Sequence, residues 1–253
     1  MLERYRRILS GKQKPKFIIS GNKINRLVKD IDECKVDVVI NDNDDELEPL
    51  HSASLYFSGS MMKYIYGNKK DIGKRISTKQ TAKWIDLRAK EGKSIVISPG
   101  NIMESIPRIL KILSMVKSNI PIVLKTDGYY SENIANSLKD IVDVYIINFK
   151  FFSNECSMFL SSTEDYVDTV KRNILIAERY GDLIIEHQLL PSHIECDSKP
   201  IVEWINNNLK KKNVRISADY KPEIGVCEEI SRRISIAEYN DLIKHAKSIG
   251  LEI

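Results

Sequence analysis

Four side chains that could take part in chemistry lie in or just beyond predicted strands: Lys150, His187, His193 and Tyr220. The ordinary pKa of histidine is about 6.5, so either histidine could act as an acid or a base near neutral pH. His187 falls inside a predicted strand, where a hydrogen-bonded core histidine is the more common finding, and His193 falls in the following loop. Lys150 could bind a carboxylate or phosphate, or could simply form a surface ion pair. We take His187 and His193 as candidate catalytic residues, and Lys150 and Tyr220 as candidate anion-binding residues.

The four cysteines, Cys34, Cys156, Cys196 and Cys227, are far apart in the sequence, and none belongs to a CxxC pair. In an intracellular protein of this size, such cysteines are most simply reduced and mostly buried thiols. The sequence therefore predicts no metal site.

An acidic run at residues 41–48 invites a calcium interpretation. An EF-hand loop needs glycine at its sixth position and glutamate at its twelfth. Counted from Asp42, those positions hold Leu47 and Ala53. A solvated acidic loop is the better interpretation.

The composition is that of an ordinary globular protein of 253 residues, with 42% hydrophobic and 29% charged residues. A net charge of +4 is only mildly basic, so nucleic acid is an unlikely class of partner. No apolar run is long enough to span a bilayer, and no apolar signal core follows the basic N-terminal residues. We expect a cytoplasmic protein with no membrane partner.

Six apolar, β-branched runs alternate with helical patterns from residue 52 onward. The runs cover residues 53–57, 94–97, 120–125, 143–148, 183–190 and 214–217. Near-continuous apolar runs are typical of parallel strands that are covered on both faces. Ser77 and Ser235 each precede a capping-box pattern, Pro200 suits an early helical position, and Gly250 suits a helix end.

Six βα repeats predict an α/β fold with a parallel sheet, and six repeats favour a partial barrel over the complete eight-stranded one. We expect residues 51–253 to form this barrel. Residues 1–50 are predicted to be an N-terminal extension packed on it. Such barrels carry their functional residues on the loops after the strands' carboxyl ends.

Several phrases of the sequence follow these predicted strands. They are FSG at 57–59, TDGY at 126–129, DIVDVYIINFK at 140–150, HQLLPSHIEC at 187–196, DYKP at 219–222 and RRIS at 232–235. Together they resemble the radical S-adenosylmethionine (SAM) enzymes, most closely the pyruvate formate-lyase activating enzyme-like branch. The resemblance covers about residues 50–253 and implies a partial (β/α)6 TIM-like barrel of radical SAM type.

The resemblance also implies a C-x3-C-x2-C loop that holds a [4Fe-4S] cluster, and here its three cysteine positions are Ser60, Tyr64 and Gly67. Thiolates hold such clusters, and glycine offers no ligand at all. Two more positions depart from the family: Asn148 replaces an aspartate, and Glu186 replaces an arginine. No cluster and no conventional radical catalysis are therefore expected.

Our first hypothesis is a cluster-free pseudoenzyme with a binding, regulatory or partner-subunit role. Its site, with Lys150, Tyr220 and the degenerate loop, could still bind SAM, a related nucleoside or a peptide. Its partner could be a cluster-bearing paralogue. The second hypothesis is an enzyme with non-radical chemistry, which needs a deep polar pocket around Lys150, His187, His193 and Tyr220. The third is an RNA-associated module that uses surface lysines such as those at 210–212.

Overall fold

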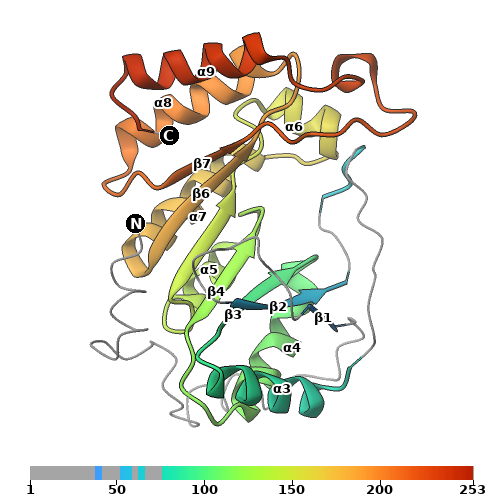
Figure 1. Ribbon diagram of the computed structural model, residues 1–253, viewed down its shortest axis with the longest axis vertical. Coiled ribbons are helices and arrows are strands. Elements are labelled where there is room, and N and C mark those ends of the chain that lie inside the picture. The colour runs from blue at the N-terminus through green and yellow to red at the C-terminus, as the bar shows by residue number, and fades with distance from the viewer. Residues whose placement is uncertain (1–37, 42–51, 59–61, 66–75, 253) are drawn as a thin grey trace.

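The computed structural model describes residues 38–41, 52–58, 62–65 and 76–252 (Figure 1). Within these residues the strands form one seven-stranded sheet whose order follows the chain, from β1 to β7. The strands are β1 (Val38–Asn41), β2 (Ser52–Phe57), β3 (Ser94–Pro99), β4 (Ile122–Thr126), β5 (Val144–Asn148), β6 (Asp182–Gln188) and β7 (Val214–Ser217). Strands β2 to β7 are parallel, and β1 pairs with β2 in the antiparallel direction. The predicted α/β fold with six parallel strands is confirmed.

Helical segments follow each of the parallel strands. They are α3 (Thr78–Lys90), α4 (Ile102–Met115), α5 (Glu132–Leu138), α6 (Asn154–Ser161), α7 (Tyr166–Tyr180), α8 (Lys199–Asn208) and α9 (Ile236–Ser248), with a π-helical turn η2 (Ile194–Ser198) and a 3-10 turn η3 (Glu228–Ile230). Figure 1 shows α8 and α9 side by side near β6 and β7, and α3 and α4 together at the opposite end of the sheet. None of the helices in the described ranges is both long and apolar enough to cross a membrane.

The predicted helix ends are confirmed. Ser77 and Ser235 each accept a hydrogen bond from the third residue of their helix, and the Gln80 and Glu238 side chains reach back to the cap amides. Such reciprocal bonds pair two amides that would otherwise lack partners at a helix start. Gly250 has a φ of +79°, the left-handed conformation that commonly ends a helix.

The pleat of the strands divides their apolar side chains between two faces. Ile95, Ile97, Leu124, Ile147 and Ile185 belong to the large core that also contains the helix side chains. A separate small cluster on the second face consists of Val96, Val123, Val144, Ile146 and Ile184. Since side chains alternate, Lys125, Asn148 and Glu186 continue this second face towards the carboxyl ends of their strands.

The elements that were not predicted from the sequence include the short helix α6 after β5 and the π-helical turn η2 after β6. Both lie at the carboxyl ends of the strands, where function was expected. Residues 38–41 of the predicted N-terminal extension form the edge strand β1. The acidic run after Asn41, the Ser60 and Gly67 positions and Cys34 lie outside the described residues.

Candidate functional site

Three side chains that follow the carboxyl ends of β2, β4 and β5 meet in one group: Tyr64, Asp127 and Lys150. The Tyr64 hydroxyl donates a 2.8 Å hydrogen bond to Oδ2 of Asp127. The Lys150 ammonium lies 4.1 Å from the centre of the Tyr64 ring and 3.5 Å from Oδ1 of Asp127. The cation thus contacts both the aromatic face and the carboxylate, two favourable electrostatic interactions.

The backbone around Tyr64 is held against helix α6. The amides of Lys63 and Ile65 donate to the carbonyls of Ser161 and Leu160, at 3.1 and 3.0 Å. These bonds fix the position of the one described member of the degenerate cluster loop. Next to it, a pocket lined by Met62, Gly100, Thr126 and Asp127, among others, has a volume of about 20 Å³. That is room for about one water molecule.

A line of charged side chains crosses the second face of the sheet at its carboxyl end. Glu186 lies 3.3 Å from the Lys125 ammonium and 3.7 Å from the Arg215 guanidinium. Beside it on β5, the buried side-chain oxygen of Asn148 has no hydrogen-bond partner among the described residues. An unpaired buried oxygen is costly, so this face is suited to a ligand that donates a hydrogen bond.

His187, predicted as a candidate catalytic residue, is a buried side chain with both ring nitrogens hydrogen-bonded. Nδ1 lies 2.7 Å from the Phe149 carbonyl oxygen, and Nε2 lies 2.8 Å from the Ser198 hydroxyl. These partners leave the ring with no free nitrogen for a substrate. Burial lowers the pKa of His187, because removal from water disfavours the charged ring.

This lowered pKa predicts a pH dependence of stability. Below about pH 6.5 the unfolded chain binds a proton at His187 that the folded chain does not bind, so the free energy of unfolding falls with falling pH. The slope from this one group is at most about 1.4 kcal/mol per pH unit. His187→Gln should remove that part of the slope in urea unfolding measured at several pH values between about 5 and 8. An unchanged slope in the variant would contradict the role given to His187.

The other candidate residues lie in different surroundings. The buried Tyr220 hydroxyl donates to the Ile230 carbonyl at 2.9 Å, which ties the loop after β7 to η3. Lys150 is at the carboxyl end of β5, as expected, with the contacts given above. His193 is buried in the loop before η2, and its neighbours form the second group of functional side chains.

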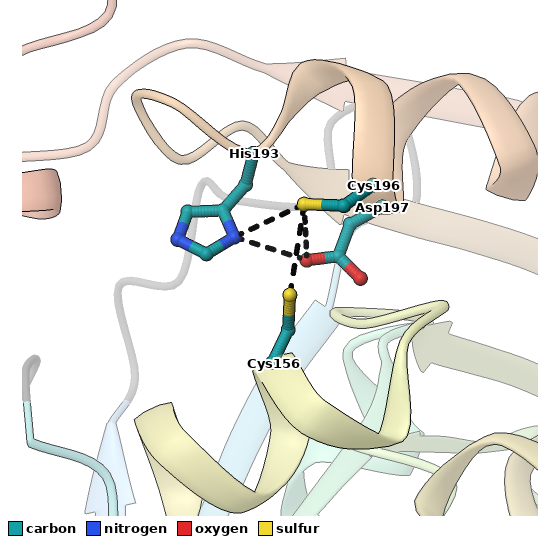
Figure 2. Close-up of side chains that lie close together, drawn as sticks. All are labelled: Cys156, His193, Cys196 and Asp197. Atoms are coloured by element: carbon teal, nitrogen blue, oxygen red, sulfur yellow. Dashed lines mark hydrogen bonds and ion pairs between the residues drawn. The ribbon is translucent and has the colours of Figure 1, made fainter.

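Cys156, His193, Cys196 and Asp197 bring two thiols, an imidazole and a carboxylate together (Figure 2). Cys156 comes from the first turn of α6, and the other three come from η2 and the residue before it. One ligand atom of each residue lies within 4.8 Å of those of the other three. The two sulfur atoms are 3.6 Å apart, and Nδ1 of His193 is 3.4 Å from the Cys196 sulfur and 3.3 Å from Oδ2 of Asp197.

Backbone and turn geometry orient this group, which we call the thiol cluster. Oδ1 of Asp197 accepts from the amides of Phe152 and Ser153 at 2.6 and 2.9 Å, which turns Oδ2 towards His193. The wider π-helical turn places His193, Cys196 and Asp197 on one side, and such turns are frequent at functional sites.

The thiol cluster alters the pKa values of its members. Burial alone would lower the pKa of His193, but hydrogen bonds with Asp197 and Cys156 outweigh it and raise the pKa to about 9. Burial raises the pKa of the Cys156 and Cys196 thiols. Without another positive charge, the thiols are therefore protonated and His193 is charged at neutral pH.

Sequence reasoning missed the thiol cluster, although it selected His193. The sequence predicts isolated thiols at Cys156 and Cys196, because 40 residues separate them in the chain. Cys156 is partly accessible and Cys196 is exposed, whereas buried thiols were predicted. The available signal was the spacing of His193, Cys196 and Asp197, three and four residues apart, which places side chains on one side of a helical turn.

No family model matches the sequence. Among curated proteins, an uncharacterized protein of Methanocaldococcus jannaschii is similar, with 29% identity over 221 residues. The match covers 82% of the chain but 64% of the relative, so the chain spans less than two thirds of the relative's length. The relative's name states no activity, so the comparison identifies a similar archaeal protein without assigning a function.

Proposed function

We propose that the chain is a cluster-free protein of radical SAM type with a binding, regulatory or partner-subunit role. The proposal takes the sheet to be the partial (β/α)6 barrel of that group. Its support is the sequential order of six parallel strands, each followed by helical segments, and the agreement of the sequence phrases with the loops at the strands' carboxyl ends.

The observation that carries the proposal is the set of contacts made by Tyr64. By the resemblance, this residue stands where the second cluster cysteine would be. Its hydroxyl instead donates to Asp127, and its ring lies under the Lys150 ammonium. Protein side chains thus surround the one described cluster-ligand position, and a phenol engaged in this way is a poor ligand for iron–sulfur chemistry.

The charged second face of the sheet supports a binding role. By the resemblance, Glu186 stands where the family has an arginine. An arginine there would lie beside Lys125 and Arg215 and would make this part of the face more positive. Glu186 instead places a negative charge between the two cations. The ligand we propose for this face is SAM, a related nucleoside or a peptide.

Anaerobic purification followed by iron and sulfide analysis tests the absence of the cluster. We expect no acid-labile sulfide in the purified chain. Calorimetry with SAM on the same sample tests the binding role. Stoichiometric iron together with sulfide would overturn the proposal, and SAM binding by the sulfide-free protein would support it.

Glu186→Gln is expected to weaken the binding of SAM, because SAM carries a net positive charge at neutral pH and the variant removes the negative charge that pairs with Lys125 and Arg215. Each partly exposed ion pair contributes at most about 1 kcal/mol, so the loss should be about threefold to tenfold. Glu91→Gln is the matched control. Glu91 also pairs with two cations, Arg88 and Lys93, but it lies at the end of α3. Equal affinity in the wild type and Glu186→Gln would argue against SAM binding at this face.

A partner subunit is the other part of the proposal. We expect a complex larger than the monomer when the chain is purified from its native host, with a cluster-bearing paralogue as the expected partner. Monomer alone in size measurements and pull-downs would count against this role. The enzyme hypothesis required a deep polar pocket that included His187 and Tyr220. The buried contacts of both residues weigh against it.

A further inference from the structure

The thiol cluster has the composition and position of a metal site that is separate from the charged second face of the sheet. Thiolate and imidazole ligands favour zinc among the common divalent ions, and structural zinc sites have four protein ligands in a tetrahedral arrangement. Cys156, His193, Cys196 and Asp197 supply two sulfurs, one nitrogen and one oxygen. Four protein donors around one point are the donor set of a closed, structural site.

Four distances between the donors, the three from the Cys196 sulfur and the one from His193 to Asp197, agree with a tetrahedron around one zinc ion, and the Cys156 sulfur lies within 4.8 Å of the His193 and Asp197 donor atoms. With Zn–S bonds of about 2.3 Å and Zn–N and Zn–O bonds of about 2.1 Å, two sulfurs lie about 3.8 Å apart, sulfur and nitrogen or oxygen about 3.6 Å, and nitrogen and oxygen about 3.4 Å. The corresponding distances in the protein are 3.6 Å for the two sulfurs, 3.4 and 3.8 Å from the Cys196 sulfur to His193 and Asp197, and 3.3 Å from His193 to Asp197. Each differs from the tetrahedral value by only about 0.2 Å.

The same distances fit a network of direct hydrogen bonds less well. A charged imidazole and a carboxylate that bond directly approach to about 2.7–2.9 Å, whereas Nδ1 of His193 and Oδ2 of Asp197 are 3.3 Å apart. The wider spacing leaves room for an ion that both atoms share.

Neighbouring groups hold two of the ligands in the orientation that a metal needs. The two backbone amides on Oδ1 of Asp197 leave Oδ2 as the single coordinating oxygen. Nδ1 of His193 faces the cluster, and Nε2, which has no hydrogen-bond partner among the described residues, lies 3.9 Å from the Glu229 carboxylate. A histidine ligand usually has its second nitrogen directed at a carboxylate or carbonyl in this way.

We propose that Cys156, His193, Cys196 and Asp197 bind one zinc ion that joins helix α6 to the π-helical turn η2. The ion links the segments that follow β5 and β6. Helix α6 also holds the residues around Tyr64, since the amides of Lys63 and Ile65 donate hydrogen bonds to carbonyls at the end of α6. The inference does not depend on the proposed function, because it rests on other residues.

Metal analysis of the full chain, purified with a thiol reductant and without chelator, tests this site. We expect one zinc per chain by mass spectrometry of the elements. Cys156→Ser and Cys196→Ser should each lower the zinc content more than about tenfold, since even partners outside the ligand shell are worth about 10- to 100-fold in affinity. Cys227→Ser is the matched control, because Cys227 is a free thiol that is not part of the cluster. It should keep the wild-type zinc content.

Cobalt substitution gives a readout that does not depend on how well the serine variants fold. Co²⁺ offered to the chelator-treated wild type should show thiolate charge-transfer absorption and the intense visible bands of tetrahedral cobalt. Three results would overturn the proposal: a folded, reduced wild type that binds neither ion, wild-type zinc content in both serine variants, or a Cys156–Cys196 disulfide in the reductant-treated protein. Zinc binding without sulfide also leaves the cluster-free proposal intact, so the zinc site and the proposed function can be contradicted independently.

Discussion

Asp197→Ala is expected to lower the free energy of unfolding by about 3–5 kcal/mol, the usual cost of removing one partner from a buried charged pair. Asp197 is only 1% exposed. Its loss would leave the Phe152 and Ser153 amides without their acceptor and His193 without the nearer of its two carboxylates. Urea unfolding in the presence of a chelator measures this effect without any contribution from a metal.

Asp197→Asn is the informative control for this result. The amide oxygen can still accept from the two backbone amides, and only the negative charge is lost. We expect a smaller loss of about 1.5–3 kcal/mol, the size of a hydrogen bond to a charged group. Equal losses in the alanine and asparagine variants would show that the backbone bonds contribute nothing measurable.

Gly128→Ala is expected to lower the free energy of unfolding by about 2–5 kcal/mol. The φ of Gly128 is +75°, a conformation that costs a residue with a Cβ about 1–2 kcal/mol. A Cβ there would also lie 2.8 Å from a methyl group of Ile147 and 3.1 Å from one of Val170. Overpacking of this kind typically costs about 1–3 kcal/mol more.

Gly92→Ala separates the two contributions, because Gly92 has nearly the same φ of +73°, but a Cβ at this position would have no described neighbour within 4 Å. We expect it to lose only the backbone part, about 1–2 kcal/mol. Thermal or urea unfolding of the two variants side by side measures the difference. A loss in Gly92→Ala as large as in Gly128→Ala would mean that the packing against Ile147 and Val170 is not responsible.

The fold was largely predictable because its signals are local. Apolar β-branched runs predicted the parallel strands, and serine caps predicted the starts of α3 and α9. Helix α6 was harder to predict, since it is short and its cap, Ser153, lacks the acidic or amide partner of a capping box. A π-helical turn such as η2 has no comparable sequence signature, because its hydrogen bonds follow from how its ends are held.

The thiol cluster could be predicted only in part. His193, Cys196 and Asp197 are close in the sequence, and their spacing is visible there. Cys156 joins them because β5 and β6 are neighbours, so the segments that follow them emerge side by side. The chemical roles of His187 and Tyr220 could not be judged from residue type, since only the structure shows that Phe149, Ser198 and Ile230 occupy their polar atoms.

The strand order has a consequence for how the chain reaches its folded state. Each of the strands from β2 to β6 pairs in parallel with the next one along the chain, so every parallel pair in the described sheet joins consecutive strands. Short sequence separation between contacts favours fast folding. We therefore expect this sheet to fold faster than a parallel sheet of the same size whose strands pair out of chain order.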